Sequence, residues 1–193
     1  YFVRLVSVKT KEQAQKEQQA AFNKQIQEQM AKQKKEAAAQ MLKDDKELQK
    51  YFAKNNLTPT KTASGLYYTI TQEGEGEHPK NGDTVEMNYT GTLLDGTKFD
   101  SNEDTAFHHV QAFQFPLGKG QVIRGWDEGV ALLKKGSKAV FYIPSAMAYG
   151  AQARPGGGAN PKGIPANSIL LFNVQLLNYK SFVEAAKTEP VKA

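Results

Sequence analysis

The chain has 193 residues, of which 39% are hydrophobic and 23% are charged, which is enough apolar material for one domain and an extension. No stretch approaches the roughly 20 apolar residues of a membrane-spanning helix, and the absence of cysteine excludes disulfides, thiolate metal sites and cysteine nucleophiles. The chain begins at Tyr1 without a basic and then apolar leader, so we expect a mature form or a fragment whose targeting signal lies upstream.

The net charge of +5 is concentrated in the first third of the chain. Residues 1–65 hold 13 Lys or Arg and 7 Asp or Glu, whereas residues 66–180 hold 10 and 11. The lysines alternate with Gln and Glu, and few aromatic residues lie among them. We interpret this pattern as a solvated helix face and expect no nucleic-acid partner.

The first segment resembles the end of the chain. Tyr1–Lys9 aligns with Phe172–Lys180, with identity at three of the nine positions. One interpretation is that residues 1–8 are the remnant strand of an upstream repeat of the same domain. The alternative is that any two amphipathic strands look alike, and nine residues do not decide between them.

Residues 9–56 are predicted to form a long helix, because Lys9–Lys54 contains neither Gly nor Pro and is rich in Ala, Gln, Lys and Glu. Its apolar stripe is a narrow seam rather than the broad face of a core helix. A dimer seam, a solvent-exposed spacer and a cradle for unfolded clients are three open interpretations. The stripe consists of Phe22, Ile26, Met30, Ala37, Met41, Leu48 and Phe52.

Residues 57–65 are predicted to be a linker, residues 66–180 a compact domain and residues 181–193 a tail. Alternation of β-branched and aromatic residues predicts strands, and apolar spacing predicts one short helix at Val122–Leu133. The fold class is therefore α+β, an antiparallel sheet with one helix on its face. The predicted strands are Leu66–Thr71, Thr84–Thr92, Lys138–Ile143 and Ser168–Tyr179.

The residues that common enzyme mechanisms need are missing. His108 and His109 are adjacent, so on a strand they would point to opposite faces and make a poor metal pair. No Gly-x-Ser-x-Gly or phosphate-loop motif is present, and the acidic residues between 100 and 104 lie too close together for an acid–base pair. We expect neither a metal nor a cofactor.

What remains is a high density of aromatic and aliphatic residues beside turns. With their motifs, these residues resemble the FK506-binding-protein (FKBP) type of peptidyl-prolyl cis–trans isomerase over about Gly65–Tyr179. The long helix and the Ser64–Tyr68 entry resemble the bacterial macrophage infectivity potentiator-like branch. The motifs are Val85–Gly91, Asp95–Ser101, Phe115–Trp126, Ala148–Gly150, Ile164–Ser168 and Leu170–Leu177.

The resemblance implies a sheet curved around the short helix and rotation of X-Pro bonds in proline-containing unfolded or nascent polypeptides. It implies inhibition by FK506-like macrolides and a place in the bacterial cell envelope or periplasm. The implied catalytic set is Tyr89, Phe99, Asp100, Trp126 and Tyr149, and the implied substrate-binding set is Phe113, Val122, Ile123, Ile164 and Phe172.

Within these sets the resemblance implies distinct roles. Trp126 would form the floor of a proline pocket, with Phe115 in the core beneath it. The Tyr149 hydroxyl and the Ile123 backbone N–H would donate to a substrate carbonyl. Asp100 would hydrogen-bond near Tyr89 and face the ligand, Ile164 would close the rim, and the remaining apolar residues would form the walls.

Two departures from the family pattern leave substrate preference open. The segment Asn102–Ala112 and the flap Ala151–Gly163 both look longer than the family's short form. Two further functions remain as alternatives. One is a chaperone in which the long helix carries the main activity and forms a homodimer, and the other is a proline-peptide binding module without catalysis.

Overall fold

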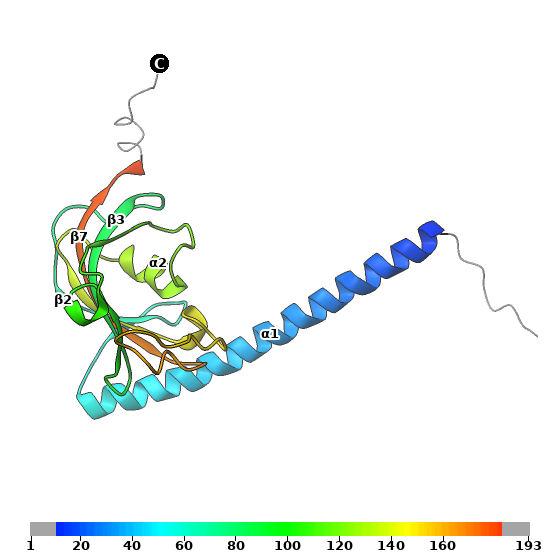
Figure 1. Cartoon of the computed structure of the whole chain (residues 1–193), viewed down its shortest axis with the longest axis horizontal. Helices are drawn as coiled ribbons and strands as arrows, with labels where there is room; N and C mark the ends of the chain where they lie inside the picture. Colours follow the sequence, from blue (N-terminus) through cyan, green and yellow to red (C-terminus); the bar gives the residue numbers. More distant parts are fainter. Residues whose placement is uncertain (1–10, 183–193) are drawn as a thin grey trace, which may run out of the picture. The chain divides into compact units, whose positions relative to one another are not determined.

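The computed structural model describes residues 11–182, so the predicted strand at residues 1–8 and most of the predicted tail lie outside the described residues (Figure 1). The chain divides into two units, Tyr1–Ala39 and Gln40–Ala193. Helix α1 (Lys11–Asn55) supplies the described part of the first unit and the start of the second.

In the first unit, every side chain of α1 whose burial the structure describes is exposed. Phe22 and Met30 of the predicted seam are 59% and 63% exposed. The ion pairs Lys24–Glu28 and Lys32–Glu36 are long, at 3.9 and 4.0 Å, and contribute little. Helix propensity, rather than packing within the described chain, supports this part of α1.

The second unit contains one antiparallel sheet of seven strands. Its order is β1-β2-β6-β7-β3-β4, and β5 pairs with β3 along the edge that β4 also uses. The four predicted strands are present within two residues of their expected bounds, whereas β1, β4 and β5 were not predicted. The strands are β1 (Thr60–Lys61), β2 (Tyr67–Gln72), β3 (Thr84–Leu93), β4 (Lys98–Ser101), β5 (Phe113–Pro116), β6 (Lys138–Ile143) and β7 (Leu170–Lys180).

Helix α2 (Arg124–Val130) lies within the curve of the sheet (Figure 1). It is shorter than predicted, because Ile123 is its extended N-cap and the chain turns after Val130. Its close approach to β6 requires glycine. A Cβ atom on Gly125 would come within 2.5 Å of the Ile143 side chain, and one on Gly129 within 2.8 Å of the Phe141 ring.

The last turns of α1 pack on the opposite face of the sheet. Side chains alternate between the faces of a strand, so Phe141 joins the α2 side while Tyr142 faces α1. Phe52 of α1 lies 4.9 Å from the Tyr142 ring and 5.0 Å from the Tyr67 ring, measured between centroids. This helix-docking cluster consists of Leu48, Phe52, Tyr67, Tyr142, Ile169 and Leu171.

A buried polar contact reinforces this docking. Asp44 is 1% exposed, and its carboxylate accepts hydrogen bonds from the backbone N–H (2.7 Å) and the hydroxyl (2.6 Å) of Ser145. Ser145 begins the short 3-10 helix η2 (Ser145–Met147), which leads to Tyr149. The end of α1 thus contacts the segment that carries a predicted site residue.

The second unit includes more of the chain than the predicted domain. It begins at Gln40, whereas the domain was predicted from residue 66, and the segment predicted as a linker contains β1, which pairs with β2. The linker also contacts the domain through Ser64, whose hydroxyl lies 2.6 Å from the carboxylate oxygens of Glu128. Among the described helices, none is both long and apolar enough to cross a membrane.

Candidate active site

The indole of Trp126 is the centre of an aromatic cage. Strand β3 places Tyr89 at 5.1 Å from it and strand β7 places Phe172 at 5.2 Å, both nearly perpendicular to the indole plane. Phe113 and Phe115 of β5 lie at 6.0 and 5.8 Å between ring centroids. Edge-to-face arrangements of this kind are favourable and hold the rings in fixed orientations.

A cavity of about 870 Å³ lies against this cage. The structure brings all ten predicted site residues to its lining, although they come from four strands, one helix and two loops. Phe115, expected beneath the pocket, is buried and is not part of the lining. The predicted residues of the lining are Tyr89, Phe99, Asp100, Phe113, Val122, Ile123, Trp126, Tyr149, Ile164 and Phe172.

Gly91 makes room for one wall of the cavity. It pairs with Asp100 of β4 on one side and with Phe172 of β7 on the other. A Cβ atom at this position would come within 2.5 Å of the Phe99 ring and 2.8 Å of the Phe172 ring. The perpendicular contact between these two rings, at 5.4 Å, therefore depends on the missing side chain.

Burial raises the pKa of two tyrosine hydroxyls in the cavity. The Tyr89 hydroxyl donates to Asp100 Oδ2 at 2.8 Å, and burial followed by this bond and the charge of Asp100 raises the pKa of Tyr89. Burial also raises the pKa of Tyr149, with the positive charge of Arg154 opposing it. Both hydroxyls therefore keep their protons at neutral pH and are able to donate.

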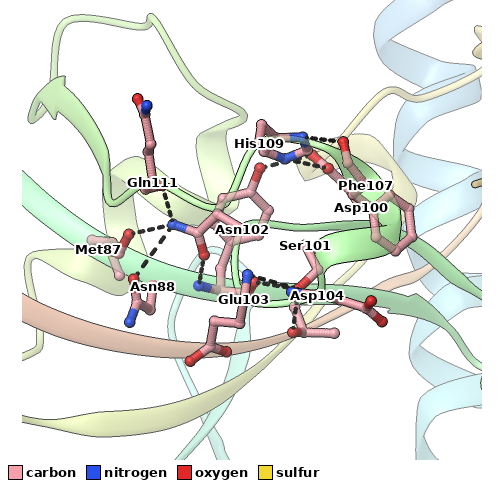
Figure 2. A network of polar contacts seen from close by, with 12 residues as sticks. Met87, Asn88, Asp100, Ser101, Asn102, Glu103, Asp104, Phe107, His109 and Gln111 are labelled. Atoms are coloured by element: carbon pink, nitrogen blue, oxygen red, sulfur yellow. Dashed lines mark hydrogen bonds and ion pairs between the residues drawn. The ribbon is translucent and has the colours of Figure 1, made fainter. Parts of the chain in front are cut away.

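A buried network holds the segment after β4 against β3 (Figure 2). Asn102 Oδ1 accepts from the Tyr89 N–H at 2.7 Å, and its amide nitrogen donates to the carbonyls of Met87 (2.9 Å) and Gln111 (2.8 Å). The Ser101 hydroxyl accepts from the backbone N–H of Asp104 at 3.2 Å. One asparagine therefore fixes both ends of this long segment.

The flap is closed by a pair of backbone hydrogen bonds. Arg154 N–H donates to the Ile164 carbonyl at 2.8 Å, and Ile164 N–H donates to the Arg154 carbonyl at 3.0 Å. This pairing places Ile164 at the cavity and brings the Arg154 guanidinium over the Tyr149 ring, 4.4 Å from its centroid.

The indole N–H of Trp126 is exceptional among the described residues. It is the one buried side-chain nitrogen or oxygen in residues 11–182 that has no hydrogen-bond partner. An unpaired buried donor costs about 1–3 kcal/mol. Burial of the unpaired indole N–H of Trp126 in the cage therefore lowers the free energy of unfolding by about this amount.

Sequence reasoning missed several residues of the lining. Their side chains are polar or small, and all but Arg124, the first residue of α2, lie on loops, so neither periodicity nor apolar character marks them. The resemblance did mark the two loop segments as longer than usual, but not which of their residues reach the cavity. The missed residues are Gln121, Arg124, Ala148, Gln152, Arg154, Pro155 and Asn160.

Comparisons with known proteins agree with this fold and cavity. The family of FKBP-type peptidyl-prolyl cis–trans isomerases matches residues 75–177. Peptidyl-prolyl cis–trans isomerase Fkbp12 of Drosophila melanogaster is 50% identical over 114 residues, which cover 58% of this chain and 96% of that protein. The chain belongs to the FKBP-type peptidyl-prolyl cis–trans isomerase family, which confirms the resemblance and the predicted fold class.

Two bacterial relatives cover more of this chain than Fkbp12 does. FkpA of Escherichia coli K12 is 40% identical over 144 residues, or 74% of this chain, and FkpA of Aeromonas hydrophila is 48% identical over 116 residues, or 60%. The crystal structure of Escherichia coli FkpA superposes with a TM-score of 0.58 at 36% identity, covering 91% of this chain and 76% of that one. The two aligned regions span 48% and 38% of those relatives' length.

Proposed function

We propose that this chain accelerates the cis–trans rotation of X-Pro bonds in unfolded or nascent polypeptides. The observation that carries the proposal is the cavity itself, in which a caged tryptophan, a Tyr149 hydroxyl and the Asp100 carboxylate meet. The family membership supports the same reaction. FK506-like macrolides are the inhibitors expected to occupy this cavity.

The chemistry needs no nucleophile, because no bond is broken. Rotation about a peptide bond faces a barrier of about 18–20 kcal/mol due to resonance, and prolyl bonds interconvert unaided in about 10–100 s. Reaching milliseconds requires roughly 10⁴-fold acceleration, or about 5.5 kcal/mol. The planar amide carries more charge separation than the twisted one, so dry aromatic walls disfavour the ground state relative to the transition state.

Directed hydrogen bonds supply a smaller share of that acceleration. The protonated Tyr149 hydroxyl and the backbone N–H of Ile123 are the donors proposed for a substrate carbonyl. A neutral hydrogen bond contributes about 0.5–1.5 kcal/mol, so the greater part must come from the shape and dryness of the cavity. Asp100, held by Tyr89, faces the ligand in this proposal.

The test is the exchange rate between the cis and trans forms of a Leu-Pro peptide, measured by NMR with and without FK506. Acceleration that the drug abolishes is the expected result. Acceleration that resists the drug would retain the isomerase and assign the difference to the long flap. No acceleration by the folded protein would overturn the proposal, and peptide binding without acceleration would identify a binding module.

We also propose a chaperone function for the exposed part of α1, with a homodimer formed along its seam. The supporting observation is the exposure of Phe22 and Met30 along one stripe. Suppression of aggregation by the variant Asp100→Val/Tyr149→Phe tests whether this function is independent of the cavity. Sedimentation of Phe22→Ser/Met30→Ser tests the dimer, which this change should dissociate.

We propose a location in the bacterial cell envelope or periplasm. The support is similarity to FkpA proteins of Aeromonas hydrophila and Escherichia coli. Fractionation of cells that express the whole gene tests it, and recovery in the cytosolic fraction alone would contradict it.

A further inference from the structure

His109 bridges two elements at the edge of the cavity. Its Nε2 lies 3.0 Å from Asp100 Oδ1, and its Nδ1 lies 2.8 Å from the carbonyl oxygen of Phe107 (Figure 2). Asp100 belongs to β4 and lines the cavity, whereas Phe107 ends the 3-10 helix η1 (Thr105–Phe107) in the long segment. The imidazole therefore joins that segment to a predicted catalytic group.

The two hydrogen-bond partners of His109 indicate which protonation state of its imidazole fits the bridge. A carbonyl oxygen only accepts, and an ionised carboxylate only accepts. A neutral imidazole has one donor nitrogen and one acceptor nitrogen, so it satisfies one of the two contacts and opposes the other. The imidazolium donates at both nitrogens and satisfies Phe107 and Asp100 together.

We propose that His109 is a positioning residue for the isomerase site and that it binds Asp100 as an imidazolium, which makes turnover depend on pH. This inference rests on the proposed function. The cation holds one carboxylate oxygen of Asp100 while the Tyr89 hydroxyl holds the other at 2.8 Å. Loss of the proton removes the attraction between the two charges and leaves the imidazole with one donor, so it holds either Asp100 or the Phe107 carbonyl but no longer both.

Among the groups around His109, Asp100 is the charged group that acts on it most strongly. Within residues 11–182 it is the carboxylate in ion-pair contact with the imidazole, whereas Asp104 pairs with Lys98 at 2.8 Å. The side chains of His109 and Asp100 are 47% and 40% exposed, so protons from solvent reach the bridge readily. The other titratable groups nearby are Tyr89 on β3, Tyr149 and Arg154 across the cavity, and His108 beside it in sequence.

The pH dependence has a definite sign. Imidazoles lose their charge between about pH 5 and about pH 8. The bridge is complete at the acidic end of that range, so kcat/KM should fall as the pH rises. A half-exposed ion pair is weak, and we expect a decrease of about threefold.

The experiment compares four proteins in the NMR exchange assay on a capped Leu-Pro peptide without titrating groups, from about pH 5 to about pH 8. His109→Gln keeps an amide donor but carries no charge, and it should give a flat profile. His109→Arg is always charged and should give a flat profile at the higher level. His108→Asn is the matched control, since asparagine tolerates the left-handed backbone at φ 60°, and it should keep the wild-type profile.

A second readout does not depend on activity. The nitrogen chemical shifts of the His109 ring report whether both nitrogens carry protons, and at the acidic end of the range both should. A flat wild-type profile, or the wild-type profile in His109→Gln, would overturn the inference while the isomerase stands. A wild-type protein inactive at every pH would instead overturn the proposed function, and the ring shifts would still decide whether the cationic bridge exists.

Discussion

Removal of the Asp44 carboxylate is the sharpest test of how α1 is joined to the β-sheet unit. In Asp44→Ala the backbone N–H and the hydroxyl of Ser145 both lose their acceptor. Ser145 is fully buried, so water does not replace the carboxylate. The two donors should therefore remain unpaired.

The magnitude follows from these two bonds, because the third donor to this carboxylate, the Gln40 amide nitrogen at 2.8 Å, is only partly buried and can turn to water. Each unpaired buried donor costs about 1–3 kcal/mol, so the two together cost about 2–6 kcal/mol. Deleting the buried charge returns part of its desolvation penalty, which brings the expected loss to about 3 kcal/mol. That is a large share of the roughly 5–15 kcal/mol stability of a typical domain. Ser145→Ala removes the hydroxyl bond alone and should cost about 1 kcal/mol.

Urea unfolding followed by the fluorescence of the single tryptophan measures these losses, because Trp126 is buried in the same unit. Glu47→Ala, an exposed change on the same helix, is the control and should stay within about 0.5 kcal/mol of wild type. The double variant Asp44→Ala/Ser145→Ala should lose less than the sum of the two single changes. A loss below about 0.5 kcal/mol in Asp44→Ala would refute the reasoning.

Three further predictions concern acid stability, packing and catalysis. Hydrogen bonds, first from Lys61, hold the pKa of Asp45 below its usual 3.8, so its contribution to stability is present above that pH and is lost as the pH falls further. Acid unfolding of Asp45→Asn should therefore lack the loss of stability that protonation of Asp45 causes in the wild type. Gly91→Ala should cost about 1–3 kcal/mol by overpacking and weaken FK506 binding, both measurable by thermal shift. Trp126→Ala should reduce kcat/KM far more than Tyr149→Phe, which removes about 0.5–1.5 kcal/mol, or up to roughly tenfold.

Each of these predictions has a contrary outcome. Equal acid sensitivity of wild type and Asp45→Asn would show that the contacts of Asp45 with Lys61 and Tyr67 contribute nothing to stability. Full stability of Gly91→Ala would mean that the two neighbouring phenylalanine rings move apart without cost. If Tyr149→Phe reduced kcat/KM as much as Trp126→Ala or more, with both proteins folded, the Tyr149 hydroxyl would contribute more to catalysis than the aromatic cage.

The sequence predicted the main strands because their residues alternate strongly, as in Thr84–Leu93. It did not predict β4 and β5, since strands of four residues carry too few alternations to register. The docking of α1 was also missed. Leu48 and Phe52 lie on a stripe that continues along the exposed part of the helix, so the pattern does not distinguish their burial from the exposure of Phe22.

The cavity lining was predictable because motif residues carry it, and their shared position depends on the family's fold. His109 and Arg154 escaped prediction for a different reason. Neither residue belongs to a family motif; each acts by contacting a residue that does. Contacts made by long loops depend on the path of the backbone, which no local sequence pattern encodes. Asn102 is similar, because its burial became visible only with the partners that its amide binds.

The Asn102 clamp makes the loop that follows β4 tolerant of changes in length and sequence. Its amide joins the segment's start to the Gln111 carbonyl, so residues 103–110 form a loop whose ends are already closed. The entropy of closing such a loop grows only with the logarithm of its length, about 0.6 kcal/mol for each doubling. Insertions or exchanges within it that leave His109 in place should therefore alter which polypeptides enter while Trp126 and its cage remain in place.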